Sequence, residues 1–142
     1  MTQAIDYSII DNELKIWEDI NIGVAVALGY EGLVVPVVRH AETLSLTGIS
    51  LAVKALVEKA RTGRLMPDDM TGGTFTCTAL GAVGVSVLFT PIINQPECAI
   101  MGTGPIVDKP VVRNGEIVAA PIMKWKLRVL GVVFCMDPEF YL

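Results

Sequence analysis

The stretch from residue 72 to residue 104 constrains the fold of this chain more than any other, because it places two strands and a sharp turn within a short length. Residues 74–78 alternate β-branched or aromatic side chains with small ones, which is typical of a strand with two differently packed faces. Gly81 and Gly84 follow, and glycine lets the backbone turn sharply and lets a ligand come close to it. Two prolines then act as rigid corners before a second apolar run, residues 98–101. The stretch therefore predicts two buried strands joined by a compact crossing.

The chain before this stretch predicts further strands and one helix. Apolar-rich runs bounded by turn residues indicate strands over residues 7–10, 14–17, 21–28 and 33–38, and Pro36 makes the last an edge or irregular strand. Ser45 can cap a helix over residues 46–62, because the apolar positions that follow it recur at three- and four-residue steps. One face of that helix is expected to be buried.

The chain after this stretch predicts a hairpin and a further strand. Residues 111–113 and 116–118 flank Asn-Gly, which accepts the positive φ angles of a type I′ turn. Basic and apolar residues alternate over residues 124–129, which favours a half-exposed strand with a basic outer face over an anion site. Together these elements predict an α/β fold, a mixed β-sheet with helices on one face.

The bulk properties exclude several classes of protein. A chain of 142 residues is the size of one domain, and 52% hydrophobic residues with a mean hydropathy of +0.55 indicates buried interfaces. No apolar run reaches the ~18 residues that span a bilayer, and no signal segment opens the chain, so membrane insertion and secretion are disfavoured. A net charge of −4 with scattered basic residues disfavours nucleic acid as a partner. A cytoplasmic or organelle-matrix protein is expected.

The three cysteines, Cys77, Cys98 and Cys135, do not have the spacing of metal ligands and cannot all pair within the chain. A free cysteine in an apolar strand behaves as a small hydrophobic residue, so we expect reduced, packed thiols for Cys77 and Cys98. No metal site is predicted.

Several motifs follow one another in a specific order and spacing. They are NIGVAV, GLVVPVVR, LVEKARTGRLMPDDM, GGTFTxTxLGxxG, FTPIINxPExAIxGxG and KPVVRNGEIVAAPIM. In this order they resemble the catalytic domain of dihydrolipoamide acyltransferases, the central component of 2-oxo acid dehydrogenase complexes, over roughly residues 4–123. The resemblance implies a coenzyme A-dependent acyltransferase fold, like that of chloramphenicol acetyltransferase. It also implies that residues 1–142 form a single, incomplete catalytic domain with a divergent tail over residues 124–142.

The resemblance assigns roles to four residues. Thr78 matches the position of the Ser or Thr hydroxyl that stabilises the tetrahedral oxyanion in the family. Ala79 and the segment from Gly104 to Ile106 would line the channel for the pantetheine and thiol groups. From the residues alone, Thr78 is also compatible with an ordinary strand threonine, and the other positions with turn geometry and packing.

The general base of the family does not have a counterpart here. In the family a histidine in an Asp-His-Arg-x-x-Asp-Gly motif deprotonates the attacking thiol. An alignment without gaps places Gly131 at that histidine and Cys135 at the second aspartate. The single histidine, His40, follows the strand over residues 33–38 and is expected to be a loop or surface residue. A family aspartate is replaced by Ala27, which weakens the expectation of coenzyme A binding.

The resemblance implies acyl transfer between dihydrolipoamide and coenzyme A. The substrates would be coenzyme A and a lipoyl group carried on another domain, without a metal. The partners would be further copies of the chain in a trimer-based core and the other components of the complex. The alternative is a non-catalytic core or interaction subunit, or an inactive truncated product. The location would be the cytoplasm, or the mitochondrial matrix in a eukaryote.

Overall fold

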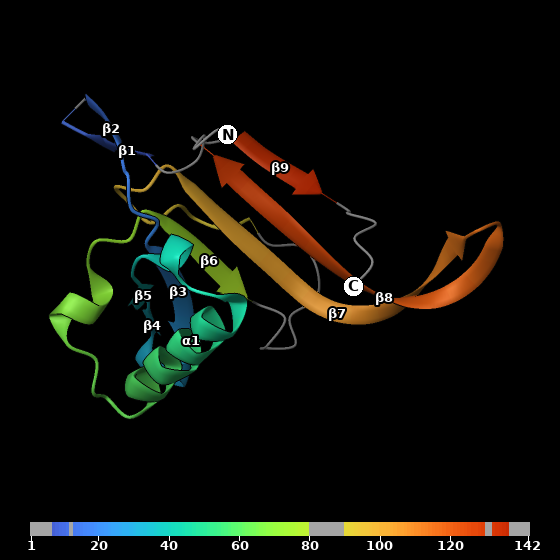
Figure 1. Ribbon diagram of the computed structural model, residues 1–142, viewed down its shortest axis with the longest axis horizontal. Helices are drawn as coiled ribbons and strands as arrows, with labels where there is room; N and C mark the ends of the chain where they lie inside the picture. Colours follow the sequence, from blue (N-terminus) through green and yellow to red (C-terminus); the bar gives the residue numbers. More distant parts are fainter. Residues whose placement is uncertain (1–6, 12, 80–89, 130–131, 137–142) are drawn as a thin grey trace.

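The computed structural model describes residues 7–11, 13–79, 90–129 and 132–136. Its main element is a seven-stranded sheet in the order β4-β3-β6-β7-β8-β9, in which β5 also pairs with β3 (Figure 1). Strands β3 (Ile22–Ala27), β6 (Phe75–Ala79) and β7 (Ala99–Arg113) run parallel, and the remaining pairs are antiparallel. The predicted mixed sheet is therefore confirmed.

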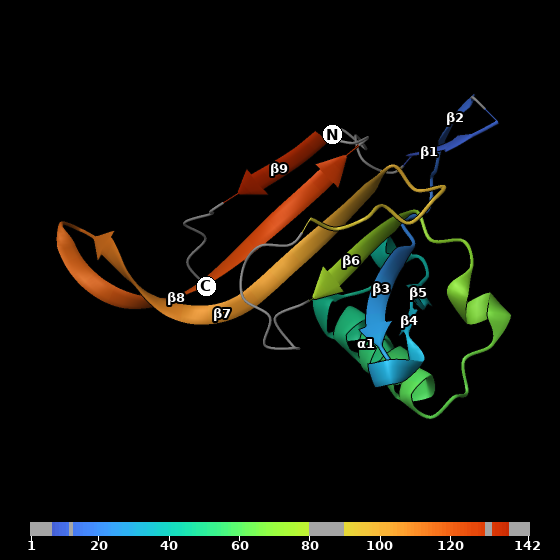
Figure 2. The same ribbon diagram turned by 180° about the vertical axis from the view of Figure 1, so that it is seen from behind.

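Helix α1 (Leu46–Arg61) covers one face of the sheet at β3 and β5, as the two opposite views show (Figures 1 and 2). The side chain of Ser45 accepts a hydrogen bond from the backbone N–H of Gly48 at 3.1 Å, so the predicted N-cap is confirmed. The helix is followed by Gly63 at φ 63°, a left-handed conformation that suits glycine at a helix end. Among the described residues, no helix is long and apolar enough to cross a membrane.

The predicted strand over residues 33–38 is interrupted, which corrects the single-strand prediction. Strands β4 (Leu33–Val34) and β5 (Val37–Val38) each pair with β3, and residues 35 and 36 lie between them. Pro36 does not have an N–H to donate, although its carbonyl still accepts a hydrogen bond from Val24 at 2.8 Å. The irregularity expected from this proline is confirmed.

The C-terminal half of the described chain is more continuous than predicted. The strand expected over residues 98–101 and the hairpin strand over residues 111–113 are parts of one strand, β7. Residues 116–118 and 124–129 likewise both belong to β8 (Glu116–Val129). Asn114 and Gly115 join β7 and β8 with φ angles of 52° and 86°, as the predicted turn requires. The hairpin curves away from the rest of the sheet (Figures 1 and 2).

The remaining elements lie at the margins of the sheet. Strands β1 (Tyr7–Ile10) and β2 (Glu13–Ile16) form the predicted N-terminal hairpin as a separate sheet. Strand β9 (Val132–Met136) pairs with β8. The described residues also include the short 3-10 turns η1 (Gly29–Glu31), η2 (Ala41–Thr43) and η3 (Pro67–Met70). The predicted turn at Gly81 and Gly84 lies outside the described residues.

Candidate active site

Thr78 lies near the carboxyl end of β6, between two neighbours with little or no side chain. In the parallel register it is paired with Ala25 of β3 on one side and Gly102 of β7 on the other. Cross-strand neighbours normally cover one another on a sheet face. Because Ala25 and Gly102 are small, Thr78 is not enclosed by them and remains half-buried. The sheet therefore leaves space around this hydroxyl.

A cavity of about 380 Å³ lies over this part of the sheet. Its sheet wall includes Thr76, Thr78 and Ile100, and the segment from Pro91 to Asn94 crosses it from the other side. Apart from Asn94 and the two threonines, the residues that line it are apolar. A largely apolar cavity with a few polar groups is the usual form of a small-molecule site.

The hydroxyl of Thr76 is buried in this cavity wall. The residue is 1% exposed, and its Oγ1 atom does not have a hydrogen-bond partner among the residues that the structure describes. Gly23 of β3 lies opposite, and a Cβ atom there would be 2.8 Å from that oxygen and 2.9 Å from Cγ1 of Val35. A glycine is therefore required at position 23 for β3 and β6 to pair at this distance.

The other three predicted site residues lie at the same end of the sheet. Ala79, the last residue of β6, is paired with Thr103 of β7. The register between β7 and β8 shifts between Thr103 and Ile106, so Gly104 lies at a β-bulge. A Cβ atom at Gly104 would be 3.3 Å from the carbonyl oxygen of Lys124, and Ile106 is 58% exposed. Thr78, Ala79, Gly104 and Ile106 thus follow one another around the carboxyl end of β6, where open α/β sheets commonly bind ligands.

His40 is at the opposite end of the parallel strands. Its backbone N–H donates to Oδ1 of Asn21 at 3.0 Å, and Asn21 precedes β3. Ala25, the partner of Thr78, is four residues further on, which corresponds to roughly 13 Å along a strand. His40 is exposed, as predicted. It cannot serve Thr78 as a base within one copy of the chain.

The two other positions that the resemblance aligned with the family's His motif are only partly visible. Gly131 lies outside the described residues. Cys135 lies in β9, paired with Lys126 of β8, and its side chain is outside what the structure describes. Ala27 is the exposed last residue of β3.

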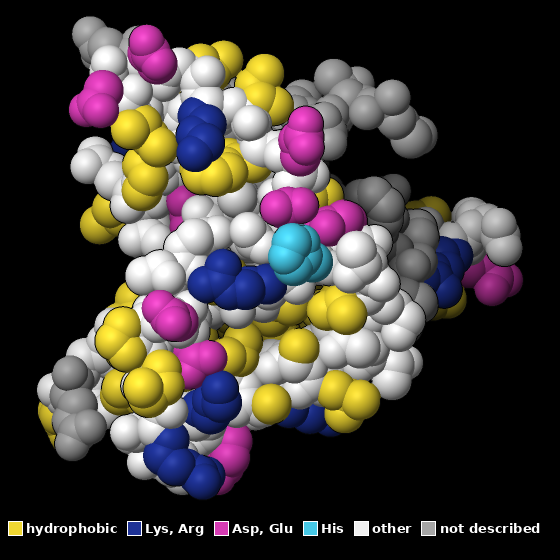
Figure 3. Space-filling view, turned by 60° about the vertical axis from the view of Figure 1, so that its left-hand side comes forward, with side chains coloured by type: hydrophobic (Ala, Val, Ile, Leu, Met, Phe, Trp, Pro, Cys, Tyr) yellow, Lys and Arg dark blue, Asp and Glu magenta, His cyan; other side chains and the backbone are white. Residues whose placement is uncertain are grey.

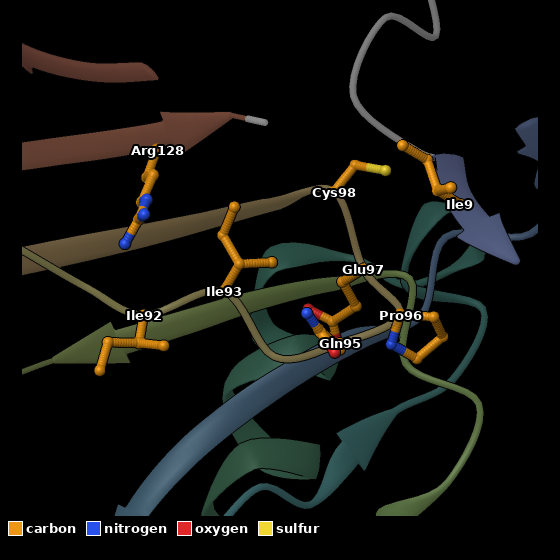
Figure 4. Close-up of a pocket in the computed structure, with 8 residues that line it drawn as sticks. All are labelled: Ile9, Ile92, Ile93, Gln95, Pro96, Glu97, Cys98 and Arg128. Atoms are coloured by element: carbon orange, nitrogen blue, oxygen red, sulfur yellow. The ribbon is translucent and has the colours of Figure 1, made fainter. Parts of the chain in front are cut away.

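A second cavity, of about 550 Å³, is also lined by Ile92 and Ile93, together with Arg128 and the residues around Glu97 (Figure 4). Arg128 of β8 points toward the segment that carries Ile92, and its Nη1 donates to the carbonyl oxygen of Pro91 at 3.2 Å. The predicted basic outer face of residues 124–129 therefore does not include Arg128. None of the residues that sequence predicted for the site lines this cavity.

Burial makes the two described cysteines unreactive. Desolvation, with a smaller contribution from the charge of Glu97, raises the pKa of the Cys77 thiol to about 11. Desolvation also raises the pKa of Cys98, which is 2% exposed. Both are free thiols, as expected, and neither is a nucleophile at neutral pH.

Sequence reasoning missed part of the cavity. Leu33, Val35 and Thr76 line it, but their patterns predict only packed strand residues. The prolines near residue 91 indicated rigid corners, yet their pattern does not reveal that the segment after Pro91 covers the face of β6. Only the crossing of the chain over the sheet brings these residues together.

The domain is thus a mixed α/β sheet with a threonine hydroxyl near the carboxyl end of its central parallel strand. The model of the family "2-oxoacid dehydrogenases acyltransferase (catalytic domain)" matches residues 4–129. The chain belongs to this family.

Named relatives agree with this assignment. The dihydrolipoyllysine-residue acetyltransferase component of the pyruvate dehydrogenase complex of Staphylococcus aureus is 48% identical over 107 residues, which is 75% of this chain and 24% of that protein. The corresponding protein of Staphylococcus epidermidis is 47% identical over the same length. The chain thus spans about a quarter of the length of the curated relatives it matches.

Solved structures show the same fold. A probable dihydrolipoamide acetyltransferase from Listeria monocytogenes superposes with a TM-score of 0.81 at 34% identity, over 88% of this chain and 53% of that one. The dihydrolipoamide acetyltransferase of Azotobacter vinelandii, in which a serine, a histidine and an asparagine were studied for their role in the catalytic mechanism, gives 0.80 at 31% identity, over 88% and 51%. The expected family and fold are both confirmed.

Proposed function

We propose that this chain supplies the oxyanion-stabilising hydroxyl of an acyltransferase site that moves an acyl group between dihydrolipoamide and coenzyme A. The observation that carries the proposal is the place of Thr78. By the family resemblance it matches the hydroxyl position, and it stands near the carboxyl end of β6 between Ala25 and Gly102, where it lines a largely apolar cavity.

The chemistry requires such a hydroxyl. A thiolate attacks the carbonyl carbon of the thioester, a C–S bond forms, and negative charge collects on the carbonyl oxygen. The oxyanion then collapses and the C–S bond of the original thioester breaks. The thiol that had carried the acyl group leaves as thiolate. A donor placed beside the oxyanion is worth roughly 3 kcal/mol. In the proposal Thr78 donates that hydrogen bond.

The bulge of β7 would guide the substrates to this hydroxyl. Ala79 and Gly104 present little side chain, and Ile106 is an exposed apolar residue beside them. Exposed backbone with small side chains suits a slender ligand such as the pantetheine arm of coenzyme A or a lipoyl chain. These three residues are proposed to line the channel.

Within the described residues of one copy, no histidine is placed to act as the base. His40 is the single histidine, and it lies at the far end of β3. The family resemblance implies that hydroxyl and histidine meet from neighbouring subunits of a trimer. We therefore propose a homo-oligomeric, trimer-based core that works with lipoyl-bearing and other components of a 2-oxo acid dehydrogenase complex in the cytoplasm. A complex of this kind is named for the Staphylococcus relatives.

The test is release of free coenzyme A from acetyl-coenzyme A with dihydrolipoamide, with and without imidazole as an added base. Without imidazole we expect the wild type, Thr78→Ala and His40→Ala to match buffer, because a missing general base costs roughly 10²–10⁴-fold. With imidazole the wild type should exceed buffer. Thr78→Val, which keeps the shape but loses the hydroxyl, should lose this rate by about 10²-fold. Thr78→Ser should keep it.

Three outcomes would contradict the proposal. An imidazole-dependent rate equal in wild type and Thr78→Val would remove the hydroxyl from the mechanism. A wild type that stays silent with imidazole would favour the non-catalytic alternative below. Robust turnover without imidazole that His40→Ala abolishes would make the upstream histidine the base.

The alternative is a non-catalytic core or interaction subunit. It is favoured by the apolar surface of the β7–β8 hairpin, where Ile106, Val107, Val112 and Ile117 are each at least 43% exposed. Light scattering should then show self-association at micromolar concentration that is reduced by Ile117→Lys. Leu51→Lys, at an exposed apolar position of α1 (62% against 78% for Ile117), is the control. A monomer in the wild type would contradict this alternative and the proposed trimer together.

A further inference from the structure

Three side chains of the metal-ligand type converge at the N-terminal end of β3, away from the cavity of Thr78. Asp19 lies just before β3, His40 follows β5, and Glu42 is in η2. One ligand atom from each lies within 4.8 Å of the other two. Figure 3 shows the histidine at the surface with acidic side chains beside it. Asp19 comes from one segment, and His40 and Glu42 come from another, so the fold brings the trio together.

The distances between the imidazole nitrogen and the two carboxylates are closer to those of two ligands on one metal ion than to those of a direct hydrogen bond. Nδ1 of His40 is 3.5 Å from Oδ1 of Asp19 and 3.6 Å from Oε1 of Glu42. A charged N–H···O hydrogen bond is about 2.7–2.9 Å long. Two ligands bound tetrahedrally to one zinc ion at about 2.0–2.1 Å lie about 3.3–3.4 Å apart. The imidazole nitrogen therefore faces two carboxylates from a distance at which one ion can bridge them.

Contacts outside the trio hold two of its members in place. The backbone of His40 has a φ of 48°, its N–H donates to Asn21 and its carbonyl accepts from Thr43 at 2.8 Å. Oε2 of Glu42 accepts from the backbone N–H of Ile20 at 2.9 Å, which leaves Oε1 toward the histidine. Metal ligands are commonly oriented by such outer contacts.

The charge of the cluster suits a divalent cation. The backbone N–H of Glu42 itself, and that of Ile20, lower the pKa of the Glu42 carboxyl. The nearby guanidinium of Arg39 donates instead to the carbonyl oxygens of Asp68 and Thr71 at 2.8 and 3.0 Å. The trio thus combines two acidic side chains with one imidazole.

We propose that Asp19, His40 and Glu42 form a surface site for a divalent transition-metal ion, with Zn²⁺ the best match and water in the remaining position. One nitrogen and two carboxylate oxygens are a zinc-type ligand set with an open position. Ligation would join the residues before β3 to the connection between β5 and η2. The proposal is independent of the acyl transfer proposed above.

The test is calorimetric titration of the metal-free protein with ZnCl₂ at pH 7.5, in a Cys135→Ser background that removes one competing thiol. We expect one equivalent to bind in the micromolar range and to be removed by EDTA. Titration with Co²⁺ should give visible absorption bands of tetrahedral coordination without a thiolate charge-transfer band. Because only the folded chain holds the trio, saturating Zn²⁺ should raise the melting temperature.

The variants decide the assignment. His40→Asn, which keeps a residue that tolerates a positive φ, should abolish binding, and Asp19→Asn and Glu42→Gln should each weaken it at least about 10-fold. Glu58→Gln and Asp108→Asn, at exposed positions elsewhere, should bind as the parent does. Circular dichroism checks that each variant is folded. Absence of binding below millimolar Zn²⁺, or binding unchanged in folded His40→Asn, would overturn the proposal.

Discussion

Apolar residues are buried in one region of the molecule and largely exposed in another. In the packed region, formed by β3, β5, β6, α1 and the start of β7, apolar residues such as Val38, Ala60 and Ile100 are at most 5% exposed. In the hairpin arm, which we define as residues 106–123, Ala120 and Ile122 are buried, but Val112 and Ile117, nearer the turn, are 64% and 78% exposed. The bulge after Thr103 separates the two regions.

The two regions differ in whether another element of the chain covers their apolar side chains. In the packed region, helix α1 lies over β3 and β5. The arm is a two-stranded ribbon beyond the reach of that helix (Figure 1). A lone two-stranded hairpin is marginally stable in water. Apolar side chains therefore stabilise the fold in the first region, whereas in the second they are available to another surface.

The largest effect should come from one substitution made in both regions. Ile100→Ala should lower the free energy of unfolding by about 2–5 kcal/mol, because it leaves a cavity beside β6. Ile117→Ala should change it by less than about 0.5 kcal/mol. Chemical denaturation of both variants measures the difference. Equal losses would mean that the arm is buried in solution and would end the comparison.

The second effect is a pH dependence of the free energy of unfolding, caused by the Cys77 thiol in the packed region. The Cys77 thiol has its pKa raised to about 11 from an ordinary value of 9.0, so the folded chain holds this proton when the unfolded chain has released it. Stability is therefore full below pH 9 and falls as the pH rises toward 11, by up to about 3 kcal/mol. Denaturation between these limits should show a shallower fall in Cys77→Ala. Parallel curves for the two proteins would show that Cys77 is not buried from solvent.

The third effect tests how closely β3 and β6 approach. Gly23→Ala should cost about 1–3 kcal/mol, because the new methyl group would contact Thr76 and Val35. The loss should be partly recovered in Gly23→Ala/Thr76→Ala, as a double-mutant cycle can measure. Gly48→Ala, whose Cβ would make only ordinary contacts in α1, is the control and should be neutral or stabilising. Additive effects at positions 23 and 76 would refute the contact.

The smallest effect should be confined to the arm. Gly115 has a φ of 86°, and placing alanine there costs about 1–2 kcal/mol. Hydrogen exchange in Gly115→Ala should quicken about tenfold at the amides of the arm, while the amides of β6 should exchange as in wild type. Equal acceleration in both regions would mean that they unfold as one unit.

Most elements were predictable because their signals are local. Ser45 and the periodicity after it indicate α1, and Asn114-Gly115 indicates the turn between β7 and β8. The extent of the strands was not predictable. Nothing near residue 104 indicates that β7 continues through the bulge, because that continuity is set by pairing with β8.

The site at Thr78 and the trio of Asp19, His40 and Glu42 likewise differ in how much of each is visible in local sequence. The family resemblance assigned Thr78, Ala79, Gly104 and Ile106 to one site from sequence alone, and their roles stay predictions. The cavity beside Thr78 depends on a segment that crosses from elsewhere. The trio of Asp19, His40 and Glu42 does not have a sequence signature, since its first member is far along the chain from the other two.

Patterns among neighbouring residues were enough to indicate the family, helix α1 and the hydroxyl at the end of β6. Only the tertiary structure decided which residues flank Thr78 and which side chains face His40. Parallel pairing of β3, β6 and β7 sets Ala25 and Gly102 beside Thr78. The antiparallel return of β5 along β3 brings His40 back to Asn21 and so to Asp19. These neighbours are far apart in sequence, and the hydrogen-bond register of the sheet, which local patterns do not encode, brings them together.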